Sequence, residues 1–161
     1  MTTPTDTNLA TVTPVGDREF RVERIFNAPR DLVWRAYTEA DLVGQWWGRG
    51  HKLLVEALDV RPGGHWRFVE HTPEDLHGFE GRFREVTKPE RIVMTFEWDG
   101  MPGHPSIDTA VFEDLGDGRT RLRVHSLFST SEERDGMLAS GMEGGMNESY
   151  QALDRLLATL R

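Results

Sequence analysis

Alternation between apolar and polar residues dominates the chain from residue 18 to residue 127, and this period of two predicts β-strands. The clearest case is residues 91–98, where Ile92, Met94, Phe96 and Trp98 all fall on one face. The same pattern predicts strands at residues 18–26, 53–60, 65–71, 79–86, 107–115 and 119–127. Short turns rich in glycine and proline join most of them, which is typical of an antiparallel sheet.

Helical spacing appears in two parts of the chain. Residues 30–39 place Leu32, Val33, Ala36 and Tyr37 on one stripe, and residues 40–46 form a second short helical segment. From about residue 131 to the C-terminus, apolar residues recur at helical spacing again, which predicts one helix of roughly 30 residues. Glycines in its first half each cost up to ~1 kcal/mol relative to alanine, so either other contacts compensate for this cost or this half is bent or mobile.

The order of these elements predicts an α+β fold. A curved antiparallel sheet of about six or seven strands would wrap around a long C-terminal helix, with two short helices after the first strand. Residues 17–161 would form this single domain. Residues 1–16 are rich in threonine and proline, and we expect them to be a disordered or loosely ordered tail.

Composition removes several classes of function. The chain has 161 residues, a net charge of −8 and no cysteine, so disulfides and thiolate metal sites are excluded. The acidic balance argues against nucleic-acid binding, and the arginines at residues 119, 121 and 123 fit a solvated outer sheet face. Neither a secretory signal nor an apolar run near 18 residues is found, so we expect a cytoplasmic protein with no membrane insertion.

Large apolar residues of the central strands are in phase with one another, so they fall on one face of the sheet. They are Trp66, Phe68, Phe79, Phe83, Met94, Phe96 and Trp98. One interpretation is ordinary core packing. The other makes part of this set the wall of an apolar ligand pocket. The glycines and methionines of the C-terminal helix favour the pocket, because they supply little rigid volume opposite the sheet.

Two polar residues continue the apolar faces. Glu70 continues the face of Trp66 and Phe68, and Ser126 continues the inner face of the last strand. Either the strand end around Glu70 is solvated, or a buried Glu70 has a partner or a raised pKa. In the second case, Glu70 is the candidate for proton handling or for orienting a ligand.

The six histidines do not predict a metal site. His65 and His71 share one strand but would lie roughly 20 Å apart, too far to bind one ion together. The spacing of known zinc motifs is also absent. We therefore expect no metal and no cofactor.

Several motifs in order resemble the SRPBCC superfamily. They are Ala28-Pro29-Arg30, Val33-Trp34, Ala36-Tyr37-Thr38, Gln45-Trp46-Trp47-Gly48, Asp59-Val60-Arg61-Pro62-Gly63-Gly64, and Lys88-Pro89-Glu90-Arg91-Ile92-Val93 with Gly81 before it. Within the superfamily, the chain is most similar to the domain shared with activators of heat-shock-protein ATPase. The superfamily also includes START lipid-transfer domains, birch-pollen-allergen-like proteins and polyketide cyclases.

The resemblance implies a helix-grip fold with a cavity between the curved sheet and the C-terminal helix. Bacterial relatives often carry Gly-Trp in that helix where this chain has Gly145-Met146, which leaves more room here. The Trp46-Trp47 pair would end the second short helix, with Trp46 in the core and Trp47 at the cavity mouth. The predicted ligand-binding residues are Trp47, Trp66, Phe68, Glu70, Phe79, Met94, Phe96, Trp98, Met142, Met146 and Tyr150.

Three functions fit this sequence. The first is a non-enzymatic domain, a monomer or homodimer, that binds an apolar or amphipathic small molecule. The second is a cyclase- or hydrolase-like enzyme that uses Glu70 with a nearby histidine or Tyr150 as an acid–base pair. The third is a co-chaperone-like or other protein-interaction domain, which requires a large exposed apolar patch.

Overall fold

A computed structural model of the chain describes residues 8–161 and shows one antiparallel sheet of eight strands, whose order is β1-β2-β8-β7-β6-β5-β4-β3. The strands are β1 (Thr11–Val15), β2 (Glu19–Phe26), β3 (Lys52–Leu58), β4 (His65–His71), β5 (Leu76–Thr87), β6 (Arg91–Trp98), β7 (Ser106–Asp114) and β8 (Thr120–Leu127). The alternation in the sequence therefore predicted the sheet correctly, apart from β1. Within residues 8–161, no helix is long and apolar enough to cross a membrane.

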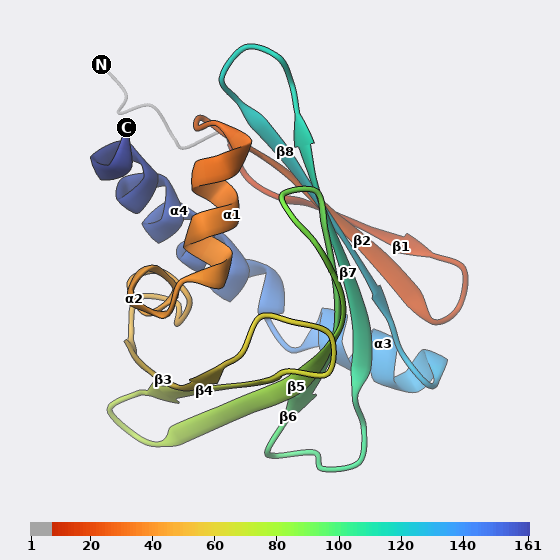
Figure 1. The fold of residues 1–161 in the computed structure, drawn as a ribbon. Helices are drawn as coiled ribbons and strands as arrows, with labels where there is room; N and C mark the ends of the chain where they lie inside the picture. Colours follow the sequence, from red (N-terminus) through yellow and green to blue (C-terminus); the bar gives the residue numbers. More distant parts are fainter. Residues whose placement is uncertain (1–7) are drawn as a thin grey trace, which may run out of the picture.

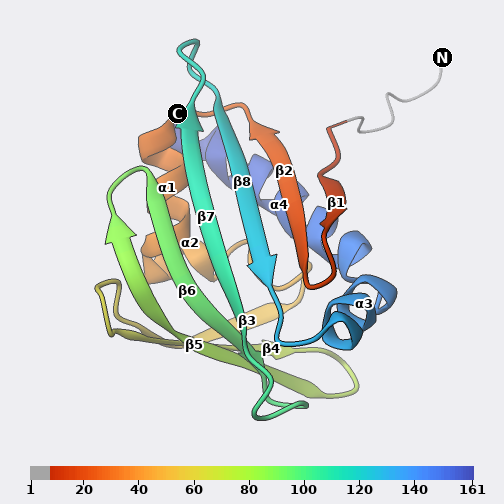
Figure 2. The same ribbon diagram turned by 90° about the vertical axis from the view of Figure 1, so that its right-hand side faces the viewer.

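Four helices complete the described part of the chain. They are α1 (Arg30–Thr38), α2 (Ala40–Val43), α3 (Ser131–Ala139) and α4 (Met142–Leu160). The sheet curves around α4, and α1 and α2 lie on the same concave side (Figure 1). Seen from its convex face, the sheet has α1, α2 and α4 behind it (Figure 2). This arrangement confirms the predicted α+β helix-grip fold.

The strong curvature of the sheet has a local cause in two of its strands. The pairing register shifts between Val55 and Ala57 in β3, and between Phe83 and Glu85 in β5. Such bulges insert an extra residue on one strand, so that the strand bends and its twist increases. The end of the sheet that carries β3 and β4 therefore folds toward α2 and α4 (Figure 1).

The N-terminal region differs from the expected tail. Residues 11–15 form β1 and pair along their whole length with β2, while residues 1–7 lie outside the described part. Thr11, Val12 and Thr13 are β-branched and suit a strand, and Pro14 is tolerated because β1 is at the edge of the sheet. The composition alone concealed this strand, since threonine and proline are also common in disordered segments.

The expected single C-terminal helix is two helices. The break lies at Gly141, whose φ of 84° is a left-handed conformation that glycine adopts without strain. Thr130 starts α3 by accepting a hydrogen bond from the backbone N–H of Glu133, and Ser140 ends it. The glycines therefore broke the helix rather than only softening it.

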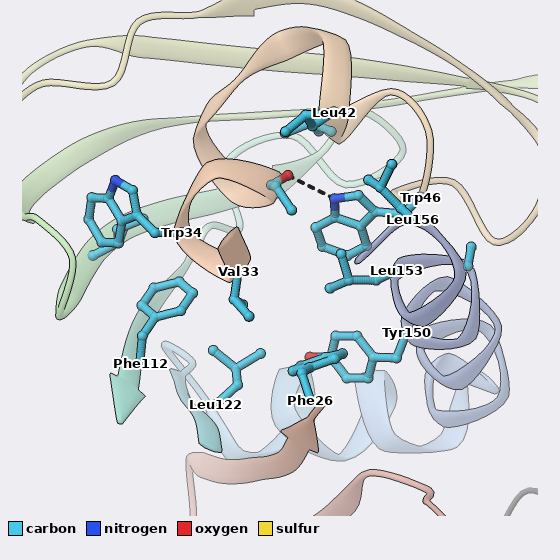
Figure 3. Close-up of a cluster of buried hydrophobic side chains, with 14 of the residues drawn as sticks. Phe26, Val33, Trp34, Leu42, Trp46, Phe112, Leu122, Tyr150, Leu153 and Leu156 are labelled. Carbon is cyan, nitrogen blue, oxygen red and sulfur yellow. Dashed lines mark hydrogen bonds between the residues drawn. The ribbon is translucent and has the colours of Figure 1, made fainter. Parts of the chain in front are cut away.

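A dense core fills the region between α1, the second half of α4 and the middle of the sheet (Figure 3). Val33, Phe112, Leu122 and Leu153 are 0 to 1% exposed. Trp46 belongs to this core, and its indole N–H donates a hydrogen bond to the backbone carbonyl of Ala36 at 2.8 Å. This placement agrees with the position expected for Trp46.

Candidate functional site

Five aromatic side chains form a cluster on the concave side of the sheet. They are Trp47, Trp66, Phe68, Phe79 and Phe96. The ring of Trp47 lies 5.1 Å from that of Phe68 and 5.2 Å from that of Phe79, both in edge-on geometry. Three strands and the turn after α2 thus bring together residues that the sequence predicted to share a site.

The cluster stands in a region that we call the open half of the concave face. Its side chains are on the inner side of the fold, yet they keep part of their accessible surface. They are Trp47, Phe79, Met94, Phe96, Asp108, Ala110, Val124, Met142 and Met146. Trp66 and Phe68 lie beneath them and are 1% and 5% exposed.

The remainder of the concave face is the closed half, defined by Phe26, Val33, Trp34, Phe112, Leu122, Leu153 and Leu157. The two halves share strands β7 and β8. The pair Ala110–Val124 of the open half is two residues along these strands from the pair Phe112–Leu122 of the closed half. They also share α4, which gives its methionines to the open half and its leucines to the closed half. The border between them crosses the middle of the sheet.

Tyr150, a predicted ligand residue, lies at this border and packs into the closed half. Its ring meets the ring of Phe26 edge-on at 5.3 Å and lies 6.5 Å from that of Trp46 (Figure 3). Burial raises the pKa of Tyr150 to about 12, although a hydrogen bond with Tyr37 acts in the opposite direction. Tyr150 therefore stays protonated across the physiological range.

Trp98, another predicted ligand residue, is not in ring contact with the aromatic cluster. It is the last residue of β6, is 39% exposed, and its ring lies close to Gly100 in the following turn. There it lines a groove of about 510 Å³ together with Arg67 and Asp99. Arg67 alternates with Trp66 and Phe68 on β4, so this groove opens on the outer face of the sheet.

Glu70 is buried, with 1% of its side chain exposed, so the alternative of a solvated strand end is wrong. Its carboxylate accepts two hydrogen bonds from the Arg49 guanidinium, at 2.8 and 2.6 Å. The ring Nδ1 of His51 lies 3.0 Å from the same carboxylate. Burial by itself would raise the pKa of Glu70, but the hydrogen bonds and charges of Arg49 and His51 outweigh it and hold the pKa below its usual value.

Arg49 reaches Glu70 across the surface of α4. Its side chain passes over Gly145, where an added Cβ would lie 2.4 Å from the Cδ of Arg49. Its backbone N–H donates to the hydroxyl of Ser149 at 3.0 Å, and its φ of 54° is unusual for a residue other than glycine. Arg49 thus fastens the turn that carries Trp47 to both β4 and α4, which sequence spacing alone could not reveal.

Asp108 is the charged residue of the open half, and the sequence interpretation missed it. It lies on β7 between Met94 of β6 and Ser126 of β8, on the concave face. The hydroxyls of Ser106 and Ser126 donate to its carboxyl, the first at 3.3 Å. Burial nevertheless raises the pKa of Asp108 to about 6. The signal was present, because Asp108 is in phase with Ala110 and Phe112.

Comparison with known proteins supports the fold and the family. The family model described as "Activator of Hsp90 ATPase homolog 1-like protein" matches residues 27–158. No curated protein matches the chain significantly. A solved structure from Rhodobacter sphaeroides is 27% identical, has a TM-score of 0.86, and the match covers 94% of this chain and 99% of that one.

Two further solved structures share the fold at lower identity. A protein from Arthrobacter aurescens is 22% identical with a TM-score of 0.83, and the match covers 92% of this chain and 91% of that one. DynU16, a protein in the dynemicin biosynthetic locus, is 23% identical with a TM-score of 0.68. That match covers 90% of this chain and 49% of DynU16. At these identities the likeness shows the fold alone.

Proposed function

Because the chain belongs to the family of Activator of Hsp90 ATPase homolog 1-like proteins, whose domains commonly bind ligands, we propose that it binds an apolar or amphipathic small molecule. The proposed site is the open half, between the sheet and the first half of α4. One observation carries the proposal: large apolar side chains on the inner side of the fold, such as Phe96 and Met146, remain only partly buried. A ligand would remove this apolar surface from water.

The residues around this surface suit such a site. Aromatic rings supply rigid apolar walls, while Met142 and Met146 can adjust to the shape of a ligand. A few polar groups accompany them, among them Asp108 and Ser126, and ligand pockets usually combine an apolar lining with a small number of polar groups. Trp47 forms part of the wall and is held in place by the Arg49–Glu70 ion pair two residues further on.

The other two functions find less support. Both oxygens of the Glu70 carboxylate are engaged by Arg49 and its pKa is lowered, whereas a general acid needs a proton near neutral pH. Of the two kinds of partner considered for Glu70, a histidine is present, since His51 Nδ1 lies 3.0 Å from the carboxylate. No hydrogen bond joins Glu70 to Tyr150 in the described part of the chain. For a protein-interaction domain, two exposed large apolar residues, Leu76 and Trp98, line the outer groove, and nothing indicates what would cover them.

A space-filling substitution tests the proposal. Met146→Trp should occupy the open half, while Met101→Trp in an exposed loop serves as the matched control. The probe is 1-naphthalenemethanol, a neutral apolar alcohol, and binding is measured by isothermal titration calorimetry. We expect the wild type and Met101→Trp to bind the probe equally, and Met146→Trp to bind at least about ten-fold more weakly with an unchanged melting temperature.

Two results would contradict the proposal. One is that the wild type does not bind the alcohol and Met146→Trp unfolds several degrees earlier, because the space would then already be filled by side chains. The other is that Met146→Trp binds the alcohol as tightly as the wild type, because the site would then lie elsewhere.

A further inference from the structure

Asp108 is a carboxylate on a mostly apolar inner surface. Its direct neighbours across the sheet are Met94 and Ser126, and Phe96 lies diagonally from it on β6. Ala110 follows it on the same face of β7. Its hydrogen-bond partners are the hydroxyls of two serines that are only 3% and 6% exposed. Asp108 itself is only partly exposed, so its charge is incompletely solvated.

The buried carboxylate of Glu70 and the partly exposed carboxylate of Asp154 each have a cation. Glu70 accepts two hydrogen bonds from Arg49, and Asp154 accepts two from Arg24, at 2.6 and 2.7 Å. Within residues 8–161, no lysine, arginine or histidine forms an ion pair with Asp108. Burying an unpaired carboxylate is costly, and two hydroxyl donors compensate for only part of that cost.

The carboxylate of Asp108 also lies where a ligand of the proposed site would lie. It shares the concave face with Phe96, and Phe96 is 5.5 Å from Phe79 and 5.9 Å from Trp66 between ring centres. A molecule seated on these rings would therefore have its polar end within reach of β7. Asp108, which lacks a cationic partner, and the partly exposed aromatic side chains thus belong to one continuous surface.

Resting on the proposed function, we propose that the open half selects apolar molecules that carry one cationic amine, and that Asp108 is the residue that binds the amine. An ammonium group supplies both the positive charge and the hydrogen-bond donors that Asp108 lacks. The faces of the neighbouring aromatic rings also favour a cation. The net charge of −8 attracts cations and repels anions as they approach the protein.

Three compounds with the same ring system test this selectivity. They are 1-naphthylmethylamine, 1-naphthalenemethanol and 1-naphthoate, which are a cation, a neutral alcohol and an anion at pH 8. Isothermal titration calorimetry compares their binding to the wild type, to Asp108→Asn and to Asp17→Asn. Asp17 is the matched control, because it is exposed in the turn between β1 and β2.

In the wild type and in Asp17→Asn, we expect the amine to bind at least ten-fold more tightly than the alcohol, and naphthoate not to bind. In Asp108→Asn, the amine should lose its advantage over the alcohol. This change in the ratio of two affinities identifies a charge effect, because a general loss of structure would weaken both compounds alike.

Each other outcome has a distinct meaning. If the alcohol binds but the amine shows no preference, or keeps its preference in Asp108→Asn, the selection by Asp108 is overturned and the proposed function stands. If none of the three compounds binds the wild type, the proposed function fails, and the selection of amines fails with it.

Discussion

The closed and open halves of the concave face are built from the same strands and the same helix, yet only one of them is completely packed. In the closed half, Phe112, Leu122 and Leu153 are at most 1% exposed, and α1 covers them with Val33 and Trp34 (Figure 3). In the open half, the first half of α4 faces the sheet and contributes methionines and glycines in place of leucines. A single sheet can therefore supply both a rigid core and an incompletely buried surface, depending on what faces it.

The largest expected effect tests whether the closed half carries the stability. Leu153→Ala should lower the free energy of unfolding by about 3 to 4 kcal/mol, because it removes buried methyl groups and leaves a cavity. Met142→Ala, on the same helix in the open half, should cost less than about 1 kcal/mol. Urea unfolding measures both values. Equal losses in the two variants would show that the two halves are packed alike.

The next effect uses the pH dependence of Asp108. Burial raises its pKa from 3.8 to about 6, so the folded state holds this proton more tightly than the unfolded state. The contribution of Asp108 to stability therefore falls as the pH rises from about 4 to about 6, and it stays low above that range. Asp108→Asn should equal the wild type near pH 4 and be about 2 to 3 kcal/mol more stable near pH 8.

Urea unfolding of both proteins at the two pH values checks this effect. The comparison between variant and wild type is needed because Glu70, whose pKa is lowered, acts with the opposite sign: its contribution is present at neutral pH and lost as the pH falls below the ordinary range of a carboxylate. A stability difference that does not change with pH would mean that the Asp108 carboxyl is well solvated.

The smallest effect distinguishes two adjacent glycines of α4. Gly144→Ala should stabilise the protein by up to about 1 kcal/mol, because an added Cβ meets nothing within 4 Å and alanine favours a helix. Gly145→Ala should destabilise it by about 1 kcal/mol, since its Cβ would displace Arg49 from the buried Glu70. Thermal unfolding measures both. If Gly145→Ala also stabilises the protein, the ion pair between Arg49 and Glu70 does not require a glycine at this position.

Local patterns predicted most of the fold. The period of two in residues 91–98 identified β6, and glycine-rich turns indicated antiparallel pairing. β1 was missed because its composition matches that of a disordered segment, and the break at Gly141 was seen only as a weakness of one helix. Both depend on tertiary contacts: pairing with β2 in the first case, and in the second the separate packing of α3 and α4.

The candidate site was predictable only in part. The alternation of apolar residues along the strands identified Trp66, Phe68, Phe79 and Phe96. Side chains two residues apart on a strand lie on the same face, whichever residues of the neighbouring strand they pair with. The same rule placed Trp98 with them. Trp98 is the last residue of its strand, however, and its side chain packs against the following turn instead of the aromatic cluster. Arg49 was missed because its contacts join positions that only the folded chain brings together.

The contacts of Arg49 have a consequence for the order of events in folding. This residue is separated by 21 positions from Glu70 and by 100 positions from Ser149. The turn that carries Trp47 therefore lacks its anchor at Ser149 until α4 has docked, and contacts between distant positions form late because closing long loops is slow. A folding intermediate that has the sheet but not α4 would expose the aromatic cluster to solvent, where it could associate with other chains. The docking of α4 therefore also protects this cluster from aggregation.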